Sequence, residues 1–460
     1  MAKIKVLFAA SEVVPFAKTG GLADVSGSLP VALKKSGADI RVIMPKYATV
    51  KDPGDAGMLG KSVKVYFVEN DAFFRRAGLY GENGVDYKDN LSRFAYFCRE
   101  VLERMKREDF RPDIIHCNDW QTALISAYLN TLYAYDPFFK DTRTLFTIHN
   151  LAYQGVFAQA EYPKLGLDWS LFSVNYFEFY KKVNLMKAGI VYSNAISTVS
   201  PTYAEEIKTE EFGYGLEGVI RARSDVLYGI MNGIDDEVWD PTNDALIFKR
   251  YSRETLDDKY ENKVRLEKEL GLSAHKNIPL IGVISRLADQ KGFDLLTVII
   301  DELLAQDVHF VLLGTGDEKY HQQFARVAKR YPGKASIQLR FDAVLAQKIY
   351  AASDLFLIPS RYEPCGLGQM ISFKYGTVPV VRLTGGLKDS VREFDPASGQ
   401  GDGFTFQEYD ARALLRAIQK GLSVYHHKDQ WRDLVKKIMG YDFSWKRSAQ
   451  EYLRLYARVR

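Results

Sequence analysis

Short, nearly continuous apolar segments alternate with longer helical segments along this chain, in two separate series. The first series has apolar segments at 6–10, 40–44, 114–116, 145–148 and 195–199, and helical segments at 93–107 and 120–133. The second has apolar segments at 280–284, 309–313, 336–341, 355–358 and 378–381, and helical segments at 293–305, 319–330 and 344–352. Apolar strands that alternate with helices are typical of parallel sheets covered on both faces. The pattern therefore predicts an α/β protein with two doubly wound, Rossmann-like domains.

A polar stretch at 235–251 separates the two series. It contains Asp-Asp-Glu and Asp-Pro-Thr-Asn, which favour turns over regular structure. The chain has 460 residues, more than one hydrophobic core usually supports. We therefore expect a first domain at 1–240, a second at 241–440 and a helical terminal segment at 441–460.

The charge, the cysteines and the apolar segments indicate which partners and which compartment to expect. Lys and Arg total 62 and Asp and Glu 58, so the net charge of +4 gives no reason to expect a nucleic acid. The cysteines Cys98, Cys117 and Cys365 have no CxxC spacing, which favours a reducing compartment over a disulfide framework. No apolar segment approaches the roughly 20 residues of a membrane span, and the apolar run near the N-terminus is too short for a signal peptide. We expect a cytoplasmic protein with no membrane partner.

In the first half, polar residues that suit ligand binding follow predicted strands, as in other open parallel sheets. Lys18 precedes Gly20 and Gly21, whose backbone N–H groups can approach an oxyanion, although a Gly-Gly pair can also be a simple turn. His149 ends a strand, where it is either a ligand or a structural residue. Asp119 and Trp120 offer a carboxylate and a flat ring to a sugar, but Asp119 can equally cap the next helix.

In the second half, Arg286 and Lys291 follow one predicted strand and Glu363 follows another. Two cations at such a junction can converge on a diphosphate, the alternative being a solvated surface pair. Glu363 can accept hydrogen bonds from sugar hydroxyls. Cations facing a departing phosphate and carboxylates facing hydroxyls suit the transfer of a sugar from a diphosphate. No DxD follows a strand and the seven His are scattered, so no metal is expected.

The motifs together closely resemble the glycogen/starch synthase family of bacteria and plastids over nearly the whole chain. They are KTGGLADV, HN, AISTVSPTYAEEI, EFGYGLEGV, GIMNGID, SRLADQKG, RYEPCGL and KYGTVPVVRLTGGL. The resemblance implies a GT-B fold with an interdomain cleft between an acceptor-side first domain and a nucleotide-sugar-binding second domain, with the terminal helix returning to the first. It also implies transfer of glucose from ADP-glucose, or UDP-glucose in some members, to the non-reducing end of an α-1,4-glucan with retention. We expect no cofactor besides the nucleotide-sugar donor.

The resemblance also implies a role for each matching residue. Arg286 and Lys291 would neutralise the diphosphate, Glu363 would bind glucose hydroxyls, and His149 would lie beside the glucose. The remaining donor-binding positions would be Lys18, Gly20, Gly21, Asp24, Asn232, Phe341, Cys365, Gly366, Leu367, Thr384, Gly385 and Gly386. Asp119 and Trp120 would lie on the acceptor side.

Three positions depart from the family pattern. Asn118 replaces the first residue of the usual His-Asp-Trp, Gly368 stands where Thr, Ser or Asn is common, and Phe341 stands where a Tyr often stacks on adenine. These departures leave the nucleotide and the acceptor contacts open. The alternatives are another sugar-nucleotide glycosyltransferase, a catalytically silent glucan-binding protein, and a nicotinamide oxidoreductase, which would need a GxGxxG fingerprint that is absent here.

Overall fold

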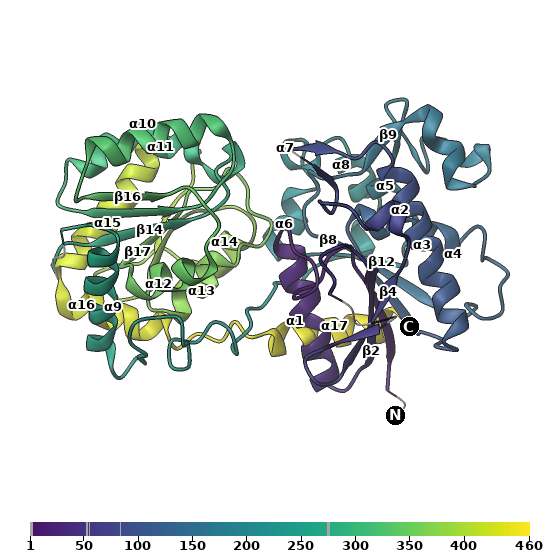
Figure 1. Cartoon of the computed structure of the whole chain (residues 1–460), viewed down its shortest axis with the longest axis horizontal. Coiled ribbons are helices and arrows are strands. Elements are labelled where there is room, and N and C mark those ends of the chain that lie inside the picture. The colour runs from purple at the N-terminus through teal and green to yellow at the C-terminus, as the bar shows by residue number, and fades with distance from the viewer. Residues whose placement is uncertain (1–2, 52–53, 55, 83, 274–276) are drawn as a thin grey trace. The chain divides into compact units, whose positions relative to one another are not determined.

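The computed structural model describes residues 3–51, 54, 56–82, 84–273 and 277–460 (Figure 1). The chain divides into two compact units. The first unit consists of Met1–Gly233 together with Trp445–Arg460, and the second of Ile234–Ser444. The first boundary, after Gly233, lies a few residues before the expected position 240. The second, after Ser444, lies a few residues after the expected position 440.

The first unit contains a sheet with the strand order β13-β12-β8-β7-β1-β2-β4-β3. Its strands are β1 (Lys5–Ala9), β2 (Asp39–Pro45), β3 (Ala56–Leu59), β4 (Val63–Val68), β7 (Ile114–Asn118), β8 (Arg143–Ile148), β12 (Ala195–Thr198) and β13 (Leu227–Gly229). Neighbouring strands are parallel except β3 and β4, which are antiparallel. Short antiparallel pairings lie outside this sheet, in β5 (Gly81–Glu82) with β6 (Val85–Asp86), and in β9 (Val156–Ala158), β10 (Glu178–Phe179) and β11 (Lys182–Asn184).

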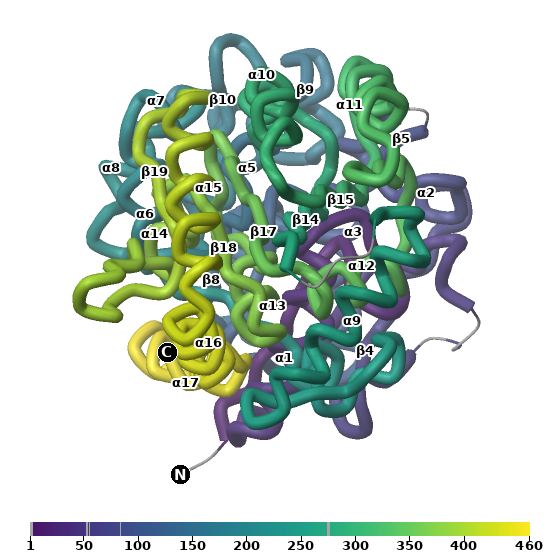
Figure 2. The backbone as a smooth tube through the Cα atoms, turned by 90° about the vertical axis from the view of Figure 1, so that its left-hand side faces the viewer, coloured from purple at the N-terminus to yellow at the C-terminus, as the bar shows by residue number. Residues whose placement is uncertain are grey.

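Helices connect these strands, and the last helix of the chain joins them. They are α1 (Gly21–Lys35), α2 (Asp71–Phe74), α3 (Asn90–Arg107), α4 (Leu124–Leu129), α5 (Leu185–Tyr192), α6 (Pro201–Glu206), α7 (Glu210–Gly213), α8 (Glu217–Ala222) and α17 (Trp445–Val459). Helix α17 lies beside α1 (Figures 1 and 2). Its buried Tyr456 hydroxyl is 2.7 Å from His116 Nδ1 on β7, which anchors the terminal helix to the sheet of the first unit.

The second unit contains a parallel sheet with the order β16-β15-β14-β17-β18-β19, whose central strands lie side by side in Figure 2. Its strands are β14 (Leu280–Ile284), β15 (His309–Leu313), β16 (Ala335–Gln338), β17 (Leu355–Ile358), β18 (Val378–Arg382) and β19 (Phe404–Phe406). Its helices are α9 (Leu256–Glu269), α10 (Phe293–Leu304), α11 (Glu318–Arg330), α12 (Ala343–Ala352), α13 (Gly368–Lys374), α14 (Gly385–Ser390), α15 (Ala411–His426) and α16 (Lys428–Ile438).

Both faces of this sheet are buried, because successive side chains of a strand point to opposite faces. On β15, Phe310 and Leu312 belong to a core shared with α10, α11 and α15. Val311 and Leu313 belong to a second core shared with α9 and α12. A sheet covered on both sides requires strands that are apolar throughout, which is the pattern seen in the sequence.

Three expectations about elements need correction. The segment 120–133 is not one helix: a 3-10 turn at Trp120–Thr122 precedes α4, which ends where Asn130 Nδ2 donates to the carbonyl oxygen of Ser126. The strand expected at 336–341 ends at Gln338, whose carbonyl accepts the last ladder hydrogen bond from Gly314. The β3–β4 hairpin was not expected, although β4 reads VKVYFV.

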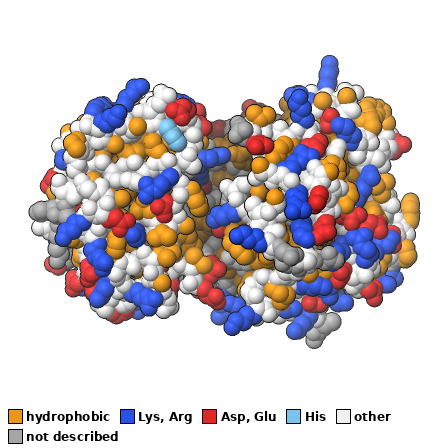
Figure 3. All heavy atoms as spheres, in the orientation of Figure 1, with side chains coloured by type: hydrophobic (Ala, Val, Ile, Leu, Met, Phe, Trp, Pro, Cys, Tyr) orange, Lys and Arg blue, Asp and Glu red, His pale blue; other side chains and the backbone are white. Residues whose placement is uncertain are grey.

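Acidic and basic side chains are interspersed over the face shown in Figure 3. Within the described ranges, every helix is too short or too polar to span a bilayer.

Candidate functional site

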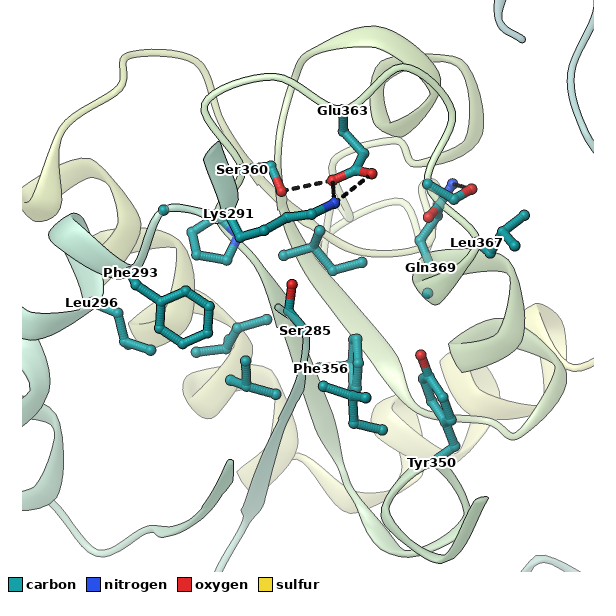
Figure 4. Close-up of a pocket in the computed structure, with 18 residues that line it drawn as sticks. Ser285, Lys291, Phe293, Leu296, Tyr350, Phe356, Ser360, Glu363, Leu367 and Gln369 are labelled. Atoms are coloured by element: carbon teal, nitrogen blue, oxygen red, sulfur yellow. Dashed lines mark hydrogen bonds and ion pairs between the residues drawn. The ribbon is translucent and has the colours of Figure 1, made fainter. Parts of the chain in front are cut away.

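The carboxyl ends of β14 and β17 border a cavity of about 130 Å³ in the second unit (Figure 4). Residues from the loops that follow these strands, and from α10, α12 and α13, complete its wall. The polar side chains among its lining residues are Ser285, Lys291, Tyr350, Ser360, Glu363 and Gln369. Ligands of open parallel sheets bind at this edge, so this cavity is the candidate binding site of the second unit.

Lys291 and Glu363 meet at the wall of this cavity. Lys291 Nζ lies 2.8 Å from Oε1 and 2.7 Å from Oε2 of Glu363, and the Ser360 hydroxyl donates to Oε2 at 2.8 Å. The Glu363 side chain is only 10% exposed, which strengthens its interaction with the ammonium. The structure thus brings together two residues predicted from different loops, and places a cation and a hydrogen-bond acceptor beside one small cavity.

The Gly385–Gly386 pair holds the loop that carries Glu363. The amide of Gly386 donates to the carbonyl oxygens of Glu363 and Pro364, both at 3.2 Å. A Cβ at Gly385 would lie 2.0 Å from the Glu363 carbonyl oxygen, and one at Gly386 would lie 2.0 Å from that of Cys365. The two glycines therefore permit a close approach of backbones, a packing role that the sequence had not suggested.

Arg286 and Phe341 lie outside the lining of the cavity. Arg286 is exposed, and its Nη2 donates to Gln290 Oε1 at 3.3 Å. Phe341 is 81% exposed, in the loop between β16 and α12. Because Arg286 does not line the cavity with Lys291 and Glu363, convergence of the two cations stays a prediction. Exposed Phe341 is compatible with a ring that stacks on a ligand.

In the first unit, the loop with Lys18 and the glycine pair is tied to a residue that the sequence had not singled out. The buried carboxylate of Glu12 accepts from the amide of Thr19 at 2.5 Å, from the amide of Gly20 at 3.1 Å and from the Tyr80 hydroxyl at 2.8 Å. Lys18 Nζ is paired with Asp24 at 2.7 Å. A Cβ at Gly20 or Gly21 would meet nothing within 4 Å. The Gly20 amide therefore donates to Glu12 and not to an oxyanion of a ligand, while a ligand can still approach the backbone at Gly20 and Gly21.

Asn118 determines which nitrogen of His149 carries the proton. Asn118 Nδ2 donates to the carbonyl oxygens of Ala9 at 3.0 Å and His116 at 3.3 Å, so its Oδ1 is left as the acceptor. His149 Nε2 lies 2.9 Å from this oxygen and must donate to it. Burial lowers the pKa of His149 to about 3. The imidazole is thus neutral near pH 7, protonated on Nε2, with Nδ1 as an acceptor.

Asp119 is not the side-chain cap of the following turn. Its Oδ1 accepts from the backbone amide of His149 at 2.8 Å, and its own φ is +56°. The carboxylate therefore ties the end of β7 to the residue that follows β8. Burial raises the pKa of Asp119 to about 7, against the lowering effect of the hydrogen bonds from the amides of His149 and Asn150.

The raised pKa of Asp119 predicts a pH dependence of stability. The unfolded chain releases this proton near pH 4, whereas the folded chain keeps it up to about pH 7. Stability from this group is therefore lost as pH rises between these values. Asp119→Asn keeps an acceptor for the His149 amide but cannot ionise. The free energy of unfolding of the variant, relative to that of the wild type, should therefore increase from pH 4 to pH 7. Urea titrations at several pH values measure this difference, and parallel pH profiles would contradict the assignment.

Trp120 and Asn232 occupy buried positions in the first unit. Trp120 is 9% exposed, edge-on to Phe94 with ring centroids 5.0 Å apart, and a Cβ at Gly155 would lie 2.5 Å from its ring. Its ring is thus mostly used for packing, and its acceptor role stays a prediction. The buried Oδ1 of Asn232 accepts no hydrogen bond from any residue that the structure describes, which suits it to a ligand hydroxyl.

The structure adds residues that the motifs did not indicate. Glu12 lies three residues after the end of β1, a position that could have indicated it, whereas Tyr350 lies inside a helix and gives no local signal. Among the described residues, no three His, Cys, Asp or Glu side chains are grouped so that they could hold a metal ion.

Two domain families match the chain. Residues 5–222 match the starch synthase catalytic domain, and residues 267–437 match the glycosyl transferases group 1. In structure, the chain is similar to the catalytic domain of starch synthase IV from Arabidopsis thaliana, solved with ADP and acarbose, at a TM-score of 0.91 and 36% identity over 100% of this chain and 99% of that one. A sucrose-phosphate synthase from Thermosynechococcus elongatus, at a TM-score of 0.64 and 16% identity over 99% of both chains, shares the fold. The fold and the matched domains define a retaining GT-B glycosyltransferase with two Rossmann-like domains.

The full-length relatives define the family within that class. The chain is 48% identical to glycogen synthase of Thermotoga petrophila, over 99% of each chain. It is 44% identical to glycogen synthase of Clostridium novyi, also over 99% of each chain. The chain therefore belongs to the glycogen and starch synthase family, as its motifs indicated, and the nicotinamide oxidoreductase alternative is excluded.

Proposed function

We propose that this chain transfers glucose from ADP-glucose to the non-reducing end of an α-1,4-glucan, with retention of the anomeric configuration. The observation that carries the proposal is the 48% identity to a glycogen synthase over 99% of both chains. The starch synthase IV structure, bound to ADP and acarbose, supports a nucleotide donor and a saccharide acceptor. We propose ADP-glucose and not UDP-glucose as the donor because the nucleotide in that structure is ADP.

In this proposal, residues of the second unit bind the donor. Lys291 and Arg286 neutralise the diphosphate, Glu363 accepts hydrogen bonds from glucose hydroxyls, and Phe341 stacks on the base. The other donor-binding positions are Cys365, Gly366, Leu367, Thr384, Gly385 and Gly386. The Lys291–Glu363 pair supports these roles, because its carboxylate can turn to hydroxyls while its ammonium turns to phosphate oxygens.

Residues of the first unit are proposed to bind the transferred glucose and the acceptor. His149 and Asn232 contact the glucose, and the neutral imidazole and the unpaired amide oxygen described above suit uncharged hydroxyls. The open backbone at Gly20 and Gly21, with Lys18 and Asp24, contributes to donor binding. Asp119 and Trp120 contribute to the acceptor side, Asp119 by positioning the His149 backbone.

The proposed reaction needs no covalent intermediate on the protein. The bond from the glucose anomeric carbon to the phosphate oxygen breaks, and the acceptor hydroxyl attacks from the same face. The departing phosphate oxygen takes the proton of that hydroxyl, so charge and atoms balance. The protein's main task is to stabilise the negative charge that develops on the phosphate, which preorganised cations do without reorganisation cost.

The test is nucleotide release measured with and without maltoheptaose, for ADP-glucose and UDP-glucose in parallel. We expect acceptor-dependent release of ADP with elongation of the maltoheptaose, and slower release of UDP. Transfer to a monosaccharide or a non-glucan acceptor instead would favour the other sugar-nucleotide glycosyltransferases of this fold. Glucan binding without nucleotide release would favour a catalytically silent protein, against which the presence of Lys18, Arg286, Lys291 and Glu363 argues. The cytoplasmic location stays a prediction.

A further inference from the structure

The side chain of Tyr350 is buried, and its hydroxyl reaches the cavity of the second unit. Tyr350 is on α12, is 5% exposed and lines the cavity beside Phe356. Its hydroxyl makes no hydrogen bond with any residue in the described part of the chain. In Figure 4 the hydroxyl points toward Leu367 and Gln369. The hydroxyl oxygen is open to the cavity, where a bound ligand can reach it.

Aromatic neighbours hold the Tyr350 ring in place. Phe356 stacks on it with centroids 4.7 Å apart and an interplanar angle of 28°. Trp239 lies edge-on at 5.7 Å, and Tyr375 is tilted at 6.3 Å. Packed interiors leave such a ring little freedom. The oxygen is therefore fixed in position, and only the O–H bond can rotate to meet a partner.

Gly368 keeps the space beside this hydroxyl open. A Cβ at Gly368 would lie 3.4 Å from the Tyr350 hydroxyl oxygen and 3.3 Å from the Phe356 ring. A longer side chain would grow into the same space. The backbone of Gly368 does not have a positive φ, so the conformation itself does not require glycine. The missing side chain thus leaves the hydroxyl accessible from the cavity.

The partner must be an acceptor compatible with the rest of the cavity wall. Lys291 supplies the positive charge there, paired with the Glu363 carboxylate that also accepts from Ser360, and Ser285 supplies a further hydroxyl. Once this carboxylate turns to hydroxyls of the ligand, the ammonium and the hydroxyls suit the oxygens of an anion. We propose that the Tyr350 hydroxyl donates a hydrogen bond to a phosphoryl oxygen of the bound nucleoside diphosphate. This inference rests on the proposed function and adds a donor-binding residue that the motifs do not include.

Tyr350→Phe tests the contact, because it removes the oxygen and keeps the ring. Calorimetric titration with ADP should show an affinity about 10- to 100-fold weaker than for the wild type, as expected for a lost hydrogen bond to a charged group. Thermal unfolding without ligand should give a midpoint no lower than the wild type's, because the substitution breaks no hydrogen bond within the described part of the chain. ADP affinity within threefold of the wild type, or a clearly lower unfolding midpoint, would overturn the proposal.

Tyr192→Phe is the matched control. The Tyr192 hydroxyl in the first unit is buried and has no hydrogen-bond partner among the described residues, and Tyr192 is not part of this cavity. Its removal should leave ADP affinity within twofold. Because binding of ADP is measured without an acceptor, the contact is tested even if glucan elongation fails. A wild-type chain that elongates glucan normally, with Tyr350→Phe binding ADP equally well, would overturn only the Tyr350 contact.

Discussion

Lys291→Met is expected to lower kcat by about 30- to 1,000-fold, corresponding to about 2–4 kcal/mol of lost transition-state stabilisation. Its ammonium is the cation that lines the cavity of the second unit, and it is held there by the Glu363 carboxylate. Without it, the charge that develops on the departing phosphate is less well compensated. Initial rates with saturating ADP-glucose and maltoheptaose measure the effect.

Lys420→Met is the control for Lys291→Met. Lys420 is 59% exposed and pairs with Glu393 at 2.7 Å, away from the lining of the cavity. Its loss also removes one positive charge from the second unit but should leave kcat within twofold. If Lys291→Met kept kcat within a few-fold while both variants remained folded by circular dichroism, Lys291 would not be the charge-stabilising residue.

Lys263→Met is expected to destabilise the chain by about 3–5 kcal/mol, because it leaves a buried carboxylate without its cation. Lys263 Nζ lies 2.6 Å from Asp354 Oδ2, and the two side chains are 1% and 3% exposed. The same oxygen accepts from the amide of Leu280, so the pair joins α9 to the strand β14. Urea unfolding followed by fluorescence measures the loss.

Lys259→Met is the matched control, one helical turn earlier on α9. Lys259 is also buried, but its ammonium donates to the Ala351 carbonyl oxygen at 2.9 Å and the Thr377 hydroxyl at 3.0 Å, not to a carboxylate. Burial lowers its pKa to about 7. At pH 8 the group is mostly neutral, so its loss should cost only about 1–3 kcal/mol. Equal losses for the two variants would show that the carboxylate is not what makes Lys263 important.

The central strands of both sheets could be predicted because they are apolar on both faces. The strands β14, β15 and β17 begin and end where the apolar runs predict. The hairpin of β3 and β4 lies at the edge of its sheet, where burial imposes a weaker pattern. The interrupted helix after Trp120 depends on hydrogen bonds of the Thr122 hydroxyl to the Asn118 and Asp119 carbonyl oxygens, which no periodicity reveals.

The site could be predicted only where its residues follow strands. Lys291 and Glu363 belong to loops after β14 and β17, and neighbouring parallel strands bring these loops together. Glu12 and Tyr350 contact segments distant in sequence, for example Tyr80 and Trp239. The tautomer of His149 depends in the same way on where Asn118 finds its own acceptors. Such contacts follow from the folded structure and leave no motif.

The linkage formed in the product tests the central claim most directly. ADP-glucose labelled with carbon-13 at the anomeric carbon is incubated with maltoheptaose, and the product is examined by NMR. We predict a new labelled α-1,4 linkage at the non-reducing end, formed only when the acceptor is present. A labelled β-linkage, a different linkage position or free labelled glucose as the main product would contradict the account.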